Sequence, residues 1–405
     1  MPGSPNVLDL VHRSCTDVAA AHAEHVKIDD AAVSALAAEL LQEREDVRAA
    51  VRGLPLPIKF SSLEQELTLL ALYHLLDFGS GYDPLLTKTS GGRDARETLL
   101  FGLIGLHLGG TRMDHHKLKS FTMYDLYTTF NIEATQEVAV MPGVTMTKPG
   151  PLQPHAKALL TAINESGAAL EEAGAKSPGE LLLSLAEGLK KAGRTTAGAF
   201  VEELIDSLPG FRDSVLYDGR TLTLHRRAQN LAADLAIVYG GRDDRFAFSD
   251  VDQLAADSGA TTIAVLRAKG VLQLSEELAS TIDEGSELPA GPHERALRAA
   301  AVAACDRVVA AAAAQAAGSA EAAGPAAAAA GEEGEESGAA AGAGAAAAGA
   351  AAEAGKEGAG TGAGSTGPAP FRAVDVGAFL AFLTEEGRPL HGKITRHVTR
   401  DVTGY

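Results

Sequence analysis

The chain has 405 residues and a formal net charge of −18. An acidic balance of this size disfavours duplex nucleic acid as a general partner, because phosphate binding needs a basic surface. Cys15 and Cys305 are the only cysteines, too few for a disulfide framework or a cysteine-based zinc site, so we expect a cytoplasmic protein. The only long apolar runs are alanine-rich and are broken by glycine or charged residues, so no run of about 18 apolar residues predicts a membrane span. The first residues lack the pattern of a secretory signal.

Hydrophobic spacing predicts helices through the first half of the chain. They are expected over residues 31–51, from the capping sequence 61–64 through 75, over 93–108, in a short helix capped by Thr122, and over 154–173, 177–192 and 195–208. Residues 141–151 are expected to form a loop. An Asp218-Gly219 pair between alternating apolar residues predicts a β-hairpin over 215–224, because both turn positions need positive φ.

The helical pattern resumes after the hairpin. Ser249 is expected to cap a helix that Asp257 closes, and further helices are expected through 266 and over 275–282 and 292–309. A dozen helices with at most a small sheet indicate a mostly α fold, since strands and helices do not alternate along the chain as they do in a Rossmann domain. We expect one helical domain over residues 1–309, an Ala/Gly-rich disordered insertion over 310–370, and a C-terminal segment, 371–405, that returns to the same domain.

Charged residues concentrate where the hairpin leads into a helix. His225-Arg226-Arg227 opens this helix, and Asp234 lies two turns beyond Arg227 on roughly the same face. Intrahelical ion pairs on a surface helix would explain this pattern from composition alone.

The order of these residues also resembles the queuosine salvage family. The matching positions are Pro209 to Asp213, Arg226-Arg227-Ala228-Gln229, Ala233-Asp234 and Ala256-Asp257, with 76–82 upstream and 297–300 and 397–405 downstream. Members of the family hydrolyse the N-glycosidic bond of queuosine 5′-phosphate and free queuine for tRNA modification. They are mostly helical and resemble DNA glycosylases in architecture. The resemblance therefore implies a cofactor-free N-glycosidase that acts on a small nucleotide.

The resemblance also assigns roles to residues. Asp257 matches the catalytic carboxylate, which would stabilise an oxocarbenium-like transition state, although any helix-terminal aspartate would look the same. Arg226 stands where the family has an active-site lysine; we expect that it supplies only positive charge there, so that Arg226→Lys keeps or raises activity. Asp77 and Phe78 would hydrogen-bond and stack the base, although a helix C-cap followed by a glycine turn explains them equally. The other implied substrate-binding residues are Arg227, Asp234, Asp375, Arg396, His397 and Tyr405.

Departures from the family pattern keep a second function open. Ser258-Gly259 follows Asp257 where the family continues differently, and the chain has no tryptophan. The alternative is a paralogue that binds a nucleotide or base without turnover. A DNA or RNA base glycosylase is a third possibility, which the acidic charge opposes. We expect no metal site at Asp114-His115-His116, because adjacent histidines point apart on a helix or strand. The oligomeric state stays open.

Overall fold

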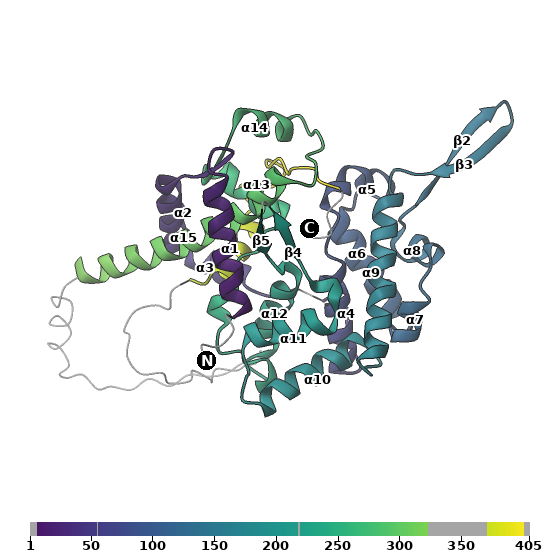
Figure 1. Ribbon diagram of the computed structural model, residues 1–405, viewed down its shortest axis with the longest axis horizontal. Helices are drawn as coiled ribbons and strands as arrows, with labels where there is room; N and C mark the ends of the chain where they lie inside the picture. The colour runs from purple at the N-terminus through teal and green to yellow at the C-terminus, as the bar shows by residue number, and fades with distance from the viewer. Residues whose placement is uncertain (1–5, 55, 218, 323–370, 401–405) are drawn as a thin grey trace, which may run out of the picture.

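Helices make up most of the computed structural model, which describes residues 6–54, 56–217, 219–322 and 371–400 (Figure 1). The α-helices are α1 (Val7–Ala21), α2 (Asp30–Gln42), α3 (Arg44–Ala50), α4 (Leu63–Leu76), α5 (Asp83–Thr89), α6 (Ala95–Leu108), α7 (His115–Lys119), α8 (Met123–Phe130), α9 (Gln153–Glu172), α10 (Pro178–Lys191), α11 (Ala197–Ser207), α12 (Arg226–Tyr239), α13 (Ala260–Ala268), α14 (Glu276–Asp283), α15 (Pro292–Ala322) and α16 (Ala373–Phe382). Short 3₁₀ helices are η1 (Ser80–Tyr82), η2 (Pro209–Phe211), η3 (Asp244–Phe246) and η4 (Val251–Gln253). The mostly helical fold predicted from the sequence is confirmed.

The described strands form three antiparallel pairs. The strands are β1 (Val26–Ile28), β2 (Thr135–Met141), β3 (Val144–Pro149), β4 (Ser214–Tyr217), β5 (Arg220–Thr223) and β6 (Leu272–Leu274), paired β1–β6, β2–β3 and β4–β5. The β4–β5 hairpin is the predicted one, with Ser214 opposite Thr223 and Gly219 at a φ of +72°. Asp218 lies outside the described residues. No described helix combines the length and apolarity that a membrane crossing requires.

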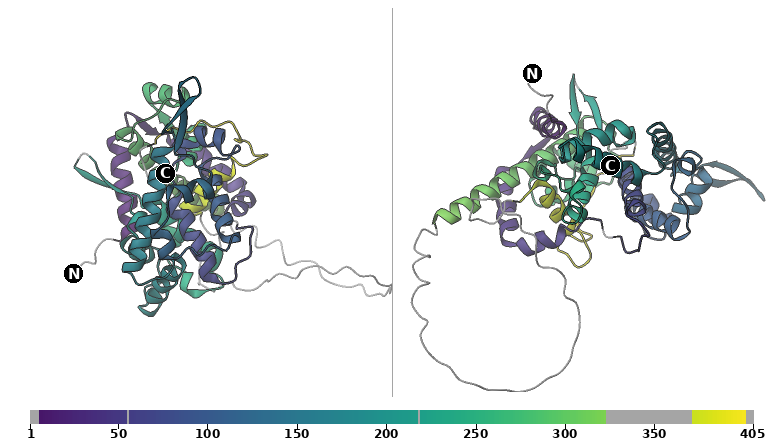
Figure 2. Two further views of the ribbon diagram at one scale, coloured as in Figure 1. Left: turned by 90° about the vertical axis from the view of Figure 1, so that its right-hand side faces the viewer. Right: turned by 90° about the horizontal axis from the view of Figure 1, so that it is seen from below.

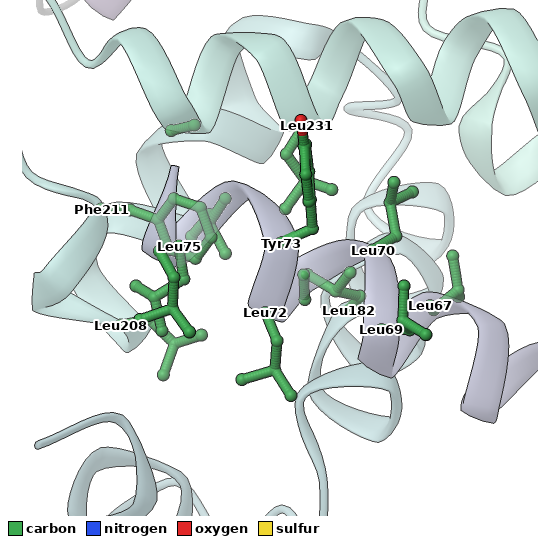
Figure 3. Packing of buried hydrophobic residues seen from close by; sticks show 14 of the residues in the cluster. Leu67, Leu69, Leu70, Leu72, Tyr73, Leu75, Leu182, Leu208, Phe211 and Leu231 are labelled. Carbon is green, nitrogen blue, oxygen red and sulfur yellow. The ribbon is translucent and has the colours of Figure 1, made fainter. Parts of the chain in front are cut away.

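The main core is built around α4. Every residue from Leu67 to Leu76 is buried, because the sequence LTLLALYHLL has almost no polar face to turn toward water. The helix packs against α6, α9, α10 and α12, and its leucines interdigitate with Leu182, Phe211 and Leu231 (Figure 3). Surrounded in this way, α4 is a fixed support for the residue that follows it, Asp77.

A second cluster of buried residues joins the two ends of the chain. Long α15 packs against α1, α2, α13 and α16, and α16 also contacts α3, as Figure 2 shows from two further sides. The helix continues through Ala322, beyond the predicted end at residue 309, and Ala312 is buried. The rest of the predicted insertion, residues 323–370, lies outside the described residues.

Several local predictions are wrong. Residues 141–151 are not a loop; most of them belong to the β2–β3 hairpin. The helix predicted over 31–51 is two helices that meet at Glu43. Ser249 does not cap a helix that ends at Asp257, because only the short η4 follows it. The carboxylate of the neighbouring Asp250 accepts hydrogen bonds from the N–H groups of Ala197 and Gly198 at the start of α11. Asp257 therefore lies in an extended segment before α13.

A buried histidine supports the turn that follows α4. The ring of His155 on α9 stacks on Tyr82 at 4.9 Å between centroids and meets Phe78 edge-on at 6.0 Å. Gly79 has a φ of +96°, and a Cβ there would lie 2.2 Å from the His155 ring. The turn thus needs glycine for both its backbone conformation and its closeness to the ring.

We predict that this histidine makes the fold sensitive to acid. Burial lowers the pKa of His155 to about 4, below the value of about 6.5 in an unfolded chain. Its stabilising contribution is therefore complete above pH 6.5 and is lost as the pH falls toward 4, by up to about 3 kcal/mol. The free energy of unfolding of His155→Gln should fall less between pH 7 and pH 4.5 than that of the wild type.

The control is His391→Gln, which changes an exposed histidine. Chemical denaturation at the two pH values measures all three proteins. If the free energy of unfolding fell equally in the wild type and in His155→Gln between the two pH values, His155 would not be the source of the acid sensitivity.

Candidate active site

Two helix ends bring oppositely charged side chains together. Asp77 is the C-cap residue of α4, and Arg226 is the first residue of α12. Between β5 and α12, His225 has a φ of +44°, a left-handed conformation that turns the chain from strand into helix. Its ring Nδ1 accepts a hydrogen bond from the Asp213 N–H at 3.1 Å, which holds this turn.

Asp77, Arg96, Arg226 and Asp257 form what we call the charge cluster. Arg226 donates from Nη2 to Asp77 Oδ2 at 2.7 Å and from Nε to Asp257 Oδ1 at 2.5 Å. Arg96 donates from Nε to Asp77 Oδ1 at 2.9 Å and from Nη2 to Asp257 Oδ2 at 3.2 Å. Each carboxylate therefore contacts both guanidinium groups, and two negative charges balance two positive ones.

Both carboxyl groups of the cluster are ionised at neutral pH. Burial alone would raise the pKa of Asp257, but the positive charges of Arg226 and Arg96 outweigh it and hold the pKa well below the usual range. For Asp77 the same opposition, with Arg96 as the stronger partner, also lowers the pKa. Asp257 thus presents a negative charge in a largely buried place.

The backbone around Asp257 is held from two sides. The Gly259 N–H donates to Asp257 Oδ1 at 3.0 Å, so the carboxylate is fixed by its own chain as well as by the arginines. On the other side α16 lies close, and a Cβ at Gly377 would come within 3.2 Å of the Asp257 amide nitrogen. The C-terminal segment thereby helps to position Asp257.

A cleft of about 310 Å³ opens onto the charge cluster. Asp77, Arg96 and Asp257 line it, together with Tyr73, His74, Asn230, Asp234 and residues of α16. A much smaller cavity of about 20 Å³ also reaches the cluster, since Asp77, Arg96 and Arg226 line it together with Phe78, Asp83 and Arg396. A cavity of about 490 Å³ lies near the first half of α4, and none of the four clustered charges lines it. We therefore take the 310 Å³ cleft as the candidate site.

Arg227 and Phe78 are buried next to the cluster. Arg227 donates to the backbone carbonyls of Leu75 and Gly210, and its guanidinium lies 5.3 Å from the centre of the Phe78 ring. These contacts tie α12 to the end of α4. The explanation of α12 as a surface helix with intrahelical ion pairs is wrong, because Arg226 and Arg227 are buried and bind to other segments.

Of two further predicted residues, one lines the cleft and the other does not. Asp234 lines the cleft and accepts a hydrogen bond from His74 Nε2 at 2.9 Å. Asp375 instead binds Arg372, three residues earlier, and forms a capping box at the start of α16. The structure thus brings Asp234 to the cleft and gives Asp375 a local partner.

Of the predicted C-terminal residues, Arg396 lines the small cavity. Arg396 pairs with Asp83 at 3.0 Å, a carboxyl whose pKa burial raises to about 6. His397 is buried, and burial lowers its pKa to about 4. Arg400 reaches the carbonyl oxygen of Gly81, so this segment braces the turn after Phe78. Tyr405 lies outside the described residues.

Arg96 is the site residue that sequence reasoning missed. It is the second residue of α6, where the helix dipole disfavours a cation. The available signal was an arginine in the first turn of a helix, because a cation disfavoured there by the helix dipole implies a nearby carboxylate that offsets the cost. Its partners, 19 and 161 residues away, could not be found from local pattern.

The two adjacent histidines do not point apart. The rings of His115 and His116 lie 4.0 Å apart between centroids, and with Glu171 they form the single group of potential metal ligands found among the described residues. Lys119 pairs with Glu171 and so competes for its carboxylate. None of these residues lines the candidate cleft.

Comparison with known proteins agrees with the resemblance. Residues 144–330 match the family model described as "Queuosine salvage protein". The chain is 30% identical over 141 residues to the Queuosine 5′-phosphate N-glycosylase/hydrolase of Sphaerobacter thermophilus, an alignment that covers 35% of this chain and 43% of that protein. Over residues 144–330 the chain is therefore similar to the queuosine salvage family, and the alignment spans less than half of the Sphaerobacter protein.

The segment matched to the queuosine salvage model contains only part of the cleft. Arg226, Asp234 and Asp257 fall within residues 144–330, whereas Asp77 and Arg96 precede them. The charge cluster joins both parts, so the unmatched N-terminal helices supply half of its charges.

We predict that Arg226→Ala destabilises the protein by about 3–5 kcal/mol, because it leaves two largely buried carboxylates to share one guanidinium, that of Arg96. Arg226→Lys should recover only part of this loss. The guanidinium donates from three nitrogens, to both carboxylates and to the Asp77 carbonyl oxygen, and an ammonium cannot span these acceptors. The structure therefore argues against the hypothesis that only positive charge matters at this position.

Denaturant unfolding at pH 7 measures these free energies. Arg245→Ala is the matched control, since Arg245 pairs with Asp243 in a partly exposed place and its loss should cost less than about 1 kcal/mol. An Arg226→Lys protein as stable as the wild type would show that a simple cation suffices.

Proposed function

We propose that this chain hydrolyses the N-glycosidic bond of queuosine 5′-phosphate and releases queuine for reuse in tRNA modification. One observation carries the proposal: Asp257, which matches the family's catalytic carboxylate, is ionised and lines a cleft beside Asp77. The similarity of residues 144–330 to the queuosine salvage model supports the reaction class. The name of the Sphaerobacter protein supports the substrate.

The geometry fits the charge changes of this reaction. Breaking the bond between sugar and base leaves positive charge on the sugar ring, which a nearby carboxylate stabilises. Asp257 is that carboxylate, and Arg226 and Gly259 hold one of its oxygens in place. Asp234 and Asn230 also line the cleft, and in this proposal they hydrogen-bond the leaving base.

Arg96 fits the substrate's phosphate. Its side chain is 40% exposed, whereas that of Arg226 is 2% exposed, so Arg96 is the guanidinium that a ligand can reach. A phosphate that binds Arg96 competes with Asp257 Oδ2 for the same donor. Substrate binding would then free one oxygen of Asp257 for the sugar.

The natural substrate is a free nucleotide in this proposal. A cleft of about 310 Å³ suits a small molecule, and the acidic chain opposes binding to nucleic acid. Cys15 and Cys305 are both buried free thiols, in keeping with a reducing, cytoplasmic location.

A second candidate function is binding without turnover. The observation that favours it is that both carboxylate oxygens of Asp257 already accept hydrogen bonds, from Arg226, Arg96 and Gly259. Hydrogen bonds of this strength stabilise the carboxylate and lower its reactivity. The same cleft would then retain the nucleotide or the base.

We predict that Asp257→Asn lowers kcat/KM for queuosine 5′-phosphate at least a thousandfold, about 4 kcal/mol of transition-state stabilisation. Asparagine keeps the shape of the side chain but not its charge. Free queuine, separated by chromatography, is the readout. Asp252→Asn, an exposed aspartate five residues earlier, should retain full activity.

The same assay separates the two candidate functions. A wild-type protein that binds queuosine 5′-phosphate in calorimetry but releases no queuine would support the binding paralogue. Full turnover by a folded Asp257→Asn protein would remove Asp257 from the mechanism.

A further inference from the structure

Exposed apolar side chains gather at one end of the molecule. Eight of the ten large hydrophobic residues exposed in the described chain lie between residues 101 and 146. They are Phe101 and Leu108 on α6, Tyr124 and Tyr127 on α8, and Val140, Met141, Val144 and Met146 on the β2–β3 hairpin. Scattered exposed hydrophobic residues are ordinary, but a concentration of this kind marks an interaction surface.

The β2–β3 hairpin projects from the body as an arm, residues 135–149 (Figures 1 and 2). Every residue of β3 is exposed, and β2 has one half-buried residue, Val138. A two-stranded hairpin with nothing packed on it is marginally stable in water. The ladder of the arm, which is interrupted by a register shift between Ala139 and Met141, is therefore a structure that gains stability from a surface laid against it.

The arm is electrically neutral on a strongly acidic chain. It carries one acidic residue, Glu137, and one basic residue, Lys148, whereas the whole chain has a net charge of −18. Two copies of this chain repel each other through most of their surface. The arm is a segment through which they can approach without that repulsion.

We propose that the arm binds a second copy of this chain, with Met141 and Met146 packed on Tyr124 and Tyr127 of the second copy. Helix α8 lies near the base of the arm (Figure 1). A two-fold axis would therefore let the arm of each copy pack on α8 of the other, so that the same contact forms twice. Methionine is suited to such a contact, because its flexible thioether packs well against aromatic rings.

The size and chemistry of the surface favour this occupant over others. The arm and α8 together supply roughly 20 residues, about what one side of a standard protein interface contains. Nucleic acid would need a cluster of cations, which a single lysine does not provide. An anionic membrane would repel a chain of this charge.

Analytical ultracentrifugation of the full chain between about 1 and 100 μM tests the proposal. The wild type should sediment as a dimer. Met141→Glu on the arm and Tyr124→Glu on α8 should each raise the dissociation constant at least a hundredfold. The matched control is Leu216→Glu, which places the same charge on the exposed tip of the other hairpin and should leave the dimer intact.

Circular dichroism and melting temperature show whether each variant is folded. A wild type that is monomeric throughout, or arm variants that remain dimeric, would overturn the proposal. So would a Leu216→Glu protein that dissociates as readily as Met141→Glu. Flotation of a monomeric wild type with neutral phosphatidylcholine vesicles, lost in Met141→Glu, would assign the arm to lipid instead.

Discussion

The buried guanidinium of Arg226 constrains everything around it. An arginine side chain taken out of water costs several kcal/mol unless charged partners and hydrogen-bond acceptors replace the lost hydration. Here the acceptors come from two distant segments, the end of α4 and the extended stretch that contains Asp257. These segments must meet at α12 for the charge to be tolerated, so the fold and the candidate site depend on the same contacts.

The surrounding elements keep these segments in place. Helix α4 is apolar on nearly every side and is held by four other helices, so Asp77 cannot move without disturbing the core. Asp257 has no helix of its own, and α16 packs against its backbone instead. The C-terminal segment is thus part of the site, although most of its predicted polar residues contact protein partners rather than the cleft.

Local signals could be read from the sequence, whereas long-range pairing could not. The Thr122 cap is confirmed, since Thr122 and Asp125 exchange hydrogen bonds across three residues. Ser249 looked like another cap of the same kind, but the neighbouring Asp250 accepts hydrogen bonds from a helix 52 residues away. The Pro142-Gly143 pair resembled a loop signal, and it proved to be the turn of a hairpin. Resemblance to a family located Asp77 and Asp257, because it carries information about distant contacts that periodicity does not contain.

The packing of the first helices against the last ones has a consequence for synthesis on the ribosome. The apolar faces of α1 and α2 are covered by α15, and Val26 pairs with Leu274, so their partners are made some 250–290 residues later. At about 5–20 residues per second this delay is roughly 10–50 s. The nascent chain carries uncovered N-terminal helices through that interval, while the α4 core can assemble earlier from residues up to α12. Chaperone binding during translation should therefore concentrate on the first fifty residues.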